Sequence, residues 1–163
     1  MSNRLTLATI FFLACCIASS PPAALGQAPE AEPLAYTVDL TDRSGDTFKV
    51  RLQVDDLGSA NAIYQFASTA PGTYQVMDIG RFVRRFEAWD ASGALIPSEQ
   101  ISTNQWRISR PEDVVEIRYQ LAETWDTPVP EHPVYLMCGT SIEDDHVQIN
   151  GQAVFGYPTG MQA

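Results

Sequence analysis

The sequence predicts an all-β fold, either an antiparallel β-sandwich or a curved sheet of short strands. Several segments alternate apolar and polar residues with the period of two that characterises a half-buried strand. Turn-forming residues separate these segments at short intervals, and no apolar pattern of helical period extends over three turns after the N-terminal leader. Short strands at such spacing, without competing helices, are typical of a sandwich or a strongly curved sheet.

Residues 1–26 have the features of a signal peptide. Arg4 supplies a positive charge, residues 5–18 form an apolar run too short to span a bilayer comfortably, and Ala24-Leu25-Gly26 is a small-x-small cleavage site. A buried N-terminal helix is the alternative interpretation of the same run. We therefore expect export to the periplasm or the medium, and no transmembrane span in the mature chain.

Two cysteines within the leader raise the alternative of a lipid anchor. Leu13-Ala14-Cys15-Cys16 resembles a bacterial lipobox. However, Cys16 follows a cysteine where a small residue is expected, and Cys15 has Phe12 at the position usually held by leucine. Anchoring is therefore the less favoured alternative, and it would tether the product without changing its fold.

A linker over residues 27–34 is predicted to precede one β domain over residues 35–163. The linker is rich in proline and alanine and has no apolar period, which predicts a flexible segment. Residues 36–40 and 48–54 then alternate strictly, and a short loop containing Ser44-Gly45 joins them. This pattern predicts an antiparallel hairpin.

The segment after the next strand is expected to organise the sheet. Residues 62–68 are the predicted third strand, and Pro71-Gly72 follows it. Proline fixes one φ angle and glycine permits a positive one, so the chain can reverse here. Residues 82–89 then alternate and are apolar on much of both faces, with arginines interleaved. We expect this strand to be central.

Further short strands are expected between residues 90 and 121. Asp90-Ala91-Ser92-Gly93 predicts a tight turn, because aspartate and serine bond their own backbone and Gly93 can adopt positive φ. Turn signals follow at Pro97, Asn104 and residues 110–113. They separate predicted strands at residues 95–96, 105–109 and 114–121.

The alternation breaks over residues 122–145, where prolines predict a long irregular loop. Trp125, Tyr135 and Met137 are expected to pack this loop over one end of the sheet. Between its irregular parts, residues 134–137 are a candidate strand.

Two strand-like segments then flank Asn150-Gly151, a dipeptide that favours a hairpin turn. Phe155 and Tyr157 follow this turn and have no evident partner later in the sequence.

The charge of the chain is strongly acidic, at a formal −10. Such a chain will not seek phosphate backbones, so we expect no nucleic-acid partner. The excess of carboxylates also predicts that at least one of Arg81, Arg84 and Arg85 is held by an acid such as Glu87. Only Cys138 lies beyond the leader, so no intramolecular disulfide is expected.

Several segments in a fixed order resemble the N-terminal β domain of the glycyl aminopeptidase family, the sixty-first family of metallopeptidases. The resemblance covers roughly residues 35–160, and the segments that carry it are Pro71-Gly72-Thr73-Tyr74, the run 76–79 followed by Arg81, Phe86-Glu87-Ala88, Asp90-Ala91-Ser92-Gly93, Trp106-Arg107-Ile108, Ile117-Arg118-Tyr119 and the run 147–156. In that family a thermolysin-like zinc domain follows the β domain. The resemblance therefore implies a catalytic metallopeptidase domain as the partner. It also implies further strands after residue 160, so we expect the domain to be C-terminally incomplete and able to self-associate through an unpaired C-terminal edge.

No catalytic, cofactor or metal site is predicted within the chain. A zinc peptidase of this kind needs His-Glu-x-x-His, whereas His132 and His146 lie fourteen positions apart and neither begins such a motif. A metal site from these histidines with Glu143, Asp144 and Asp145 is a weaker alternative, and a Cys138 nucleophile is weaker still. We therefore expect a protein that is not an enzyme and binds no cofactor.

Two functional hypotheses remain. The first is a non-catalytic N-terminal β domain that scaffolds and helps wall the substrate cleft of a catalytic domain. The second is a free-standing exported module that binds peptide or glycan through Trp89, Trp106 and Trp125, of which Trp89 and Trp106 are more readily explained as core residues. The candidate residues for ligand or interdomain contact are Tyr74, Arg81, Trp125 and His132.

Overall fold

Two antiparallel sheets make up most of the protein. The computed structural model describes residues 34–55 and 57–161, and these residues contain a five-stranded sheet ordered β1-β2-β8-β4-β5 and a four-stranded sheet ordered β11-β3-β7-β6. The first sheet comprises β1 (Ala35–Asp39), β2 (Thr47–Gln53), β8 (Val114–Ala122), β4 (Val83–Asp90) and β5 (Leu95–Ile96). The second comprises β11 (Tyr157–Pro158), β3 (Ile63–Gln65), β7 (Gln105–Ile108) and β6 (Ser98–Ser102).

The remaining elements are short. A two-stranded ribbon consists of β9 (Ser141–Ile142) and β10 (Val147–Gln148), and α1 (Gly151–Val154) is the α-helix of the described residues. Single 3₁₀ turns occupy Ser59–Asn61, Ile79–Phe82 and Pro111–Asp113. Within the part of the chain that the structure describes, no helix is long and apolar enough to cross a membrane. The expected signal peptide, the two leader cysteines and nearly all of the expected linker lie outside the described residues.

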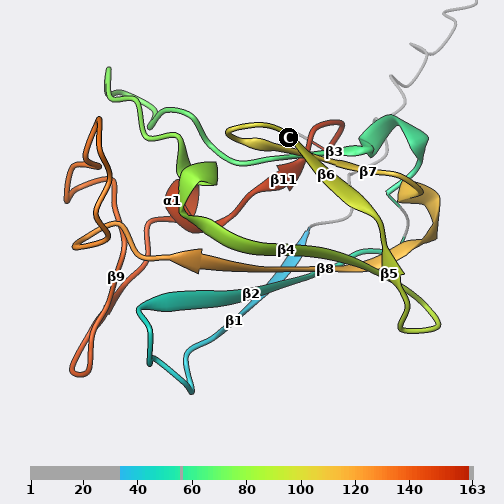
Figure 1. Ribbon diagram of the computed structural model, residues 1–163, viewed down its shortest axis with the longest axis horizontal. Helices are drawn as coiled ribbons and strands as arrows, with labels where there is room; N and C mark the ends of the chain where they lie inside the picture. The colour runs from blue at the N-terminus through green and yellow to red at the C-terminus, as the bar shows by residue number, and fades with distance from the viewer. Residues whose placement is uncertain (1–33, 56, 162–163) are drawn as a thin grey trace, which may run out of the picture. The chain divides into compact units, whose positions relative to one another are not determined.

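Aromatic side chains fill the space between the two sheets, which face each other as two layers (Figure 1). The ring centroids of Phe66 and Tyr119 are 5.0 Å apart, and those of Phe86 and Trp106 are 5.4 Å apart. Both pairs join residues on or beside strands of different sheets. The all-β prediction is therefore confirmed in its sandwich form, and Trp106 is a core residue as expected.

The strand at the centre of the larger sheet is β8. It pairs with β2 along Thr47 to Gln53 and with β4 along Val83 to Asp90. The expectation that the strand at residues 82–89 is central was therefore wrong, because β4 lies between β8 and the two-residue β5. β8 suits the middle because several side chains on both its faces are buried. The hairpin of β1 and β2 has the predicted antiparallel pairing.

Pro97 marks the place where the chain passes from one sheet to the other. β5 ends at Ile96 in the larger sheet, and β6 begins at Ser98 in the smaller one. The sequence analysis predicted no strand at residues 98–102. β6 is an edge strand whose side chains are exposed or half-buried, so it needs no run of apolar residues.

The C-terminal segment differs most from its prediction. Asn150-Gly151 is not a hairpin turn, because residue 150 is extended and residues 151–154 form α1, which buries Ala153 and Val154. β11 then pairs with β3. The expectation that Phe155 and Tyr157 have nothing to pack against was also wrong: both are half-buried, and the Phe155 ring lies 4.9 Å from that of Tyr36.

Candidate interaction surface

The long loop between β8 and β9, residues 123–140, is closed at its base by two threonines. Thr140 N donates to Thr124 Oγ1 over 2.8 Å, and Thr124 N donates back to the Thr140 carbonyl over 3.2 Å. Both threonines are buried. Gly139 is required beside this contact, because a Cβ there would lie 2.3 Å from Thr124 Oγ1. The base of the loop is therefore a fixed, buried structure.

The far part of the same loop is held by Gln75. Its amide Nε2 donates to the Pro133 carbonyl over 2.7 Å, and its Oε1 accepts from Tyr135 N over 3.0 Å. Gln75 is buried, so these hydrogen bonds are shielded from water. Gln75 lies just beyond the turn at Pro71-Gly72, which forms as predicted, with Gly72 at φ 76° and a hydrogen bond from Thr73 N to the Ala70 carbonyl.

Arg81 forms a second clamp on the loop. Its Nε donates to the Met77 carbonyl over 3.1 Å, while its two terminal nitrogens donate to the carbonyls of Glu131 and His132. His132 adopts positive φ, 51°, and its exposed side chain forms no part of this contact. Arg81 therefore fixes loop backbone from the neighbouring 3₁₀ turn.

Four large apolar side chains are exposed where this clamped loop meets the segment after β10. We call them the apolar patch: Tyr135 (60% exposed), Leu136 (56%), Met137 (75%) and Ile149 (41%). Gln148 and Asn150 join the two segments by donating to the carbonyls of Leu136 and Met137, over 3.0 and 2.8 Å.

The prediction that Trp125, Tyr135 and Met137 pack the loop down was therefore wrong, because all three are exposed. Val134 and Cys138 are buried in their place. Residues 134–137 also form no strand; turns close there instead, with hydrogen bonds from Cys138 N to the Tyr135 carbonyl and from Gly139 N to the Leu136 carbonyl.

The four residues singled out from the sequence have different environments. Arg81 and His132 meet through the backbone of the loop, and Tyr74, which is fully exposed, precedes the clamping Gln75. Trp125 is 54% exposed on the other arm of the loop, beside its base. Gln75 was not singled out, since an isolated glutamine after a turn carries no signal of burial.

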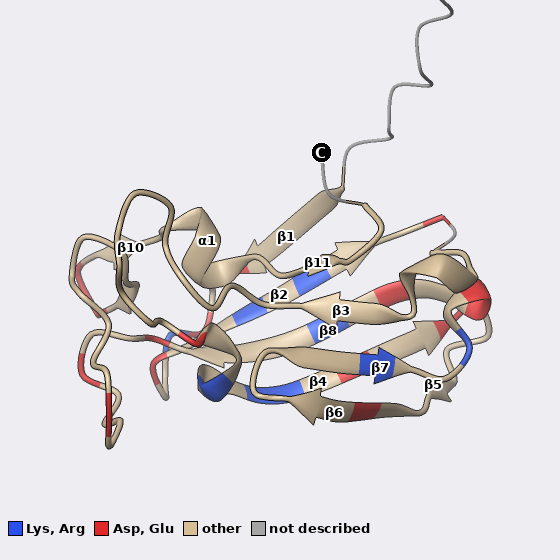
Figure 2. Cartoon of the chain, turned by 90° about the horizontal axis from the view of Figure 1, so that it is seen from above, with Lys and Arg blue, Asp and Glu red and all other residues tan. Residues whose placement is uncertain are grey.

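The outer face of the larger sheet forms a groove of about 770 Å³. Basic side chains from β2, β8 and β4 line it. Figure 2 marks the Lys and Arg positions along these strands in blue. They are paired within the protein: Arg51 and Arg118 with Glu116, Lys49 with Asp42, and, as expected, Arg85 with Glu87 at 2.5 Å. The groove is thus a polar surface whose charges are already compensated.

The three tryptophans do not share one surface. Trp106 is buried between the sheets, whereas Trp89 is half-buried in the groove, with the Arg118 guanidinium 4.8 Å from its ring centroid. Trp89 pairs across the sheet with Glu116 near the start of β8, and Trp125 follows the end of that strand. A binding platform made of all three is therefore ruled out.

With this geometry in hand, the chain can be compared with known proteins. The family described as Peptidase M61 N-terminal domain matches residues 35–163. The chain belongs to this family. The match confirms the resemblance found in the sequence, and the N-terminal domain of M61 peptidases is in general not the catalytic part.

Other comparisons add little to this M61 assignment. No curated protein matches the chain. A solved aminopeptidase N family protein from Idiomarina loihiensis is 28% identical, with a TM-score of 0.48, over 58% of this chain and 16% of its own. This chain therefore spans about a sixth of the length of that relative.

The described residues do not fit the zinc site of an M61 peptidase. His146 is exposed, and its Nδ1 contacts Asp145 Oδ1 at 2.8 Å. Over residues 34–55 and 57–161, the group of side chains close enough to share a metal ion contains carboxylates and no histidine. A zinc site with the His-Glu-x-x-His motif needs imidazole nitrogens as ligands.

Proposed function

We propose that this chain acts as a non-catalytic N-terminal β domain that packs against a metallopeptidase catalytic domain and helps wall its substrate cleft. The apolar patch is the observation that carries the proposal. Its side chains are large and exposed, yet the backbone beneath them is hydrogen-bonded to Gln75, Gln148 and Asn150. Contiguous exposed apolar groups of this kind mark interaction sites.

Both the exposure of the apolar patch and the rigidity of the loop beneath it favour docking. Burying a large apolar side chain contributes about 1.5–3 kcal/mol, so Leu136 and Met137 alone offer a substantial driving force for docking. Ordering a loop on binding opposes association, and a loop already held by Gln75 and Arg81 avoids much of that cost. The patch is thus suited to a permanent contact.

Membership of the M61 N-terminal family supports a metallopeptidase catalytic domain as the partner. A catalytic domain with an apolar docking face is the occupant that the family context supports. Export through the leader expected at residues 1–26 completes the proposal, since a secreted peptidase would carry both domains across the membrane together.

A free-standing module for peptide or glycan is the second candidate. The observation in its favour is the groove with half-buried Trp89 on the outer face of the larger sheet. Aromatic rings suit such ligands because they offer rigid apolar area with little loss of entropy. The arginines of the groove already form ion pairs within the protein, which disfavours strong binding of a charged ligand.

Binding to a catalytic domain tests the proposal. The mature chain is titrated by calorimetry with the catalytic domain of an M61 peptidase produced without its own N-terminal domain. Leu136→Asp should weaken binding at least tenfold, because it places a charge in the buried contact. Leu95→Asp is the matched control: Leu95 is equally exposed, at 54%, on the distant strand β5, and its replacement should leave the affinity unchanged.

Three results would count against the proposal. The first is an equal loss of affinity in both variants, and the second is no binding by the wild-type chain. The third is aminopeptidase activity, or one tightly bound zinc, in the chain alone, with the zinc lost on replacing His132 or His146. Saturable binding of peptides or glycans, abolished by Trp89→Ala, would instead favour the second candidate. Sedimentation of the wild-type chain shows whether it self-associates. The strand expected to mediate such association is β11, at the C-terminal edge of its sheet.

A further inference from the structure

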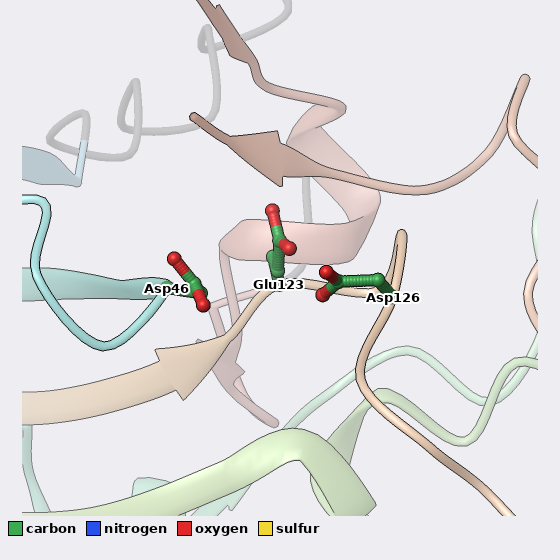
Figure 3. A group of neighbouring side chains, drawn as sticks. All are labelled: Asp46, Glu123 and Asp126. Atoms are coloured by element: carbon green, nitrogen blue, oxygen red, sulfur yellow. The ribbon is translucent and has the colours of Figure 1, made fainter. Parts of the chain in front are cut away.

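Three carboxylates from two segments converge beside the base of the long loop. Asp46 precedes β2, whereas Glu123 and Asp126 lie in the first arm of the loop, directly after β8 (Figure 3). One carboxylate oxygen from each lies within 4.8 Å of the other two. The backbone sets this arrangement independently of the side chains, because Glu123 N donates to the Asp46 carbonyl over 2.9 Å.

Glu123 has an unusual environment for a carboxylate. Its side chain lies between those of Asp46 and Asp126 (Figure 3). The residue is only 1% exposed. Oε2 accepts a hydrogen bond from Ile142 N over 2.6 Å. Oε1 is buried and receives no hydrogen bond from any described residue. A buried carboxylate oxygen without a donor is unfavourable by itself and calls for a positive group.

Within the part of the chain that the structure describes, no basic side chain forms an ion pair with Asp46, Glu123 or Asp126. Two compensating agents remain: a proton shared among the carboxylates or a bound metal cation.

We propose that Asp46, Glu123 and Asp126 form a calcium site. Carboxylates without nitrogen or sulfur donors select hard cations. Ca²⁺ binds oxygen at about 2.3–2.6 Å, so oxygens on opposite sides of one ion can be about 5 Å apart, which accommodates the observed separations. Asp46 and Asp126 are exposed, so water can complete the six to eight ligands that Ca²⁺ takes, as is usual for this ion.

A cation at this position ties two parts of the fold together. Asp46 belongs to the connection between β1 and β2, whereas Glu123 and Asp126 belong to the first arm of the long loop, directly after the central strand β8. Calcium therefore stabilises the fold because it binds the native arrangement and not the unfolded chain. This role is separate from docking and does not depend on the apolar patch.

Calorimetry with CaCl₂ on the chelator-treated, dialysed chain tests the site directly. We expect one Ca²⁺ per chain, with a Kd of about 10⁻⁴–10⁻³ M as in extracellular calcium modules, and a Tm that rises with calcium concentration. Tb³⁺ offers a second readout, because Trp125 adjoins Asp126 and can sensitise its luminescence, which added Ca²⁺ should quench by displacement.

Conservative variants separate the site from general acidity. Asp126→Asn and Glu123→Gln should each weaken calcium binding about tenfold or more, because each removes one ligand charge. Glutamine at 123 can still accept the hydrogen bond from Ile142 N, so the fold is retained, as cooperative unfolding of each variant verifies. Asp144→Asn is the control, since Asp144 is an exposed acid of the neighbouring loop and lies outside the cluster.

Any of three results overturns the proposal. Absence of saturable binding up to about 10 mM Ca²⁺ would show that a shared proton suffices. Equal weakening by Asp144→Asn, or binding that survives both cluster variants, would show diffuse attraction to an acidic surface. Tighter binding of Mg²⁺ than of Ca²⁺ would refute the choice of calcium.

Discussion

Two tyrosine hydroxyls share one buried carbonyl, and this arrangement makes a quantitative prediction. The Gly156 carbonyl accepts hydrogen bonds from Tyr36 Oη and, at 2.8 Å, from Tyr64 Oη. Gly156 is itself buried between α1 and β11. Replacing either tyrosine by phenylalanine leaves one donor in place, whereas replacing both leaves the carbonyl without either hydroxyl donor.

The expected magnitudes follow from this redundancy. A neutral hydrogen bond contributes about 0.5–1.5 kcal/mol, so Tyr36→Phe and Tyr64→Phe should each lower the free energy of unfolding by about that amount or less. Stranding a buried acceptor costs about 1–3 kcal/mol in addition. The double variant should therefore exceed the sum of the single ones by about 1–2 kcal/mol, within the range of measured coupling energies.

Urea unfolding of the four proteins in this double-mutant cycle measures the coupling, provided that the m-value stays constant. Tyr119→Phe is the internal comparison. The Tyr119 hydroxyl donates over 2.8 Å to the Val154 carbonyl, which has no second hydroxyl donor among the described residues, and it accepts from Gly156 N over 3.4 Å. Its single cost should exceed that of Tyr64→Phe. Additivity of Tyr36→Phe and Tyr64→Phe within about 0.5 kcal/mol would refute the shared acceptor.

Four further predictions concern pH, packing, a surface arginine and the loop. Burial raises the pKa of Tyr119 above its ordinary 10. The stability that depends on a protonated Tyr119 is therefore complete below about pH 10 and is lost as pH rises through the pKa of the folded state. Urea unfolding measured at a series of alkaline pH values checks this. Gly80→Ala would place a Cβ 1.9 Å from the Thr103 carbonyl oxygen and should lower the free energy of unfolding by about 1–3 kcal/mol or more in thermal melts. Arg84→Ala should change that free energy by no more than about 1 kcal/mol, whereas Arg81→Ala should speed proteolysis within residues 131–135 by releasing two loop carbonyls.

The sequence specified the larger sheet better than any other part. In β2 the residues Phe48, Val50 and Leu52 are buried and alternate with less buried polar residues, and this strict period predicts both the strand and its inward face. β6 escaped prediction because an edge strand with exposed or half-buried side chains lacks that period. β9 and β10 have two residues each, which is too short for any periodic signal.

The loop surface could not be predicted for a different reason. Large apolar residues in a loop are usually assumed to pack inward, and on that basis Tyr135 and Met137 are expected to pack the loop over the end of the sheet. What holds the loop instead is polar: Gln75 and Arg81 bond backbone carbonyls, which exist at every position and carry no sequence signal. The proximity of Asp46 and Glu123 likewise depends on the pairing of β2 with β8. These strands lie far apart in the sequence, so no local pattern indicates which residues their register brings together.

The contrast between the groove and the loop decides which surface is better suited to a lasting partner. A charged ligand in the groove must compete with the ion pairs that Arg85 and Arg118 already make. Exchanging one exposed ion pair for another gains little free energy. The apolar patch has no such competition, since water is the only neighbour that its exposed surface loses on docking. Because Gln75 holds the backbone next to Tyr135, the patch keeps its shape before the partner arrives. Docking at the loop therefore gains from burial without a large ordering cost, which is the energetic condition for a permanent interdomain contact.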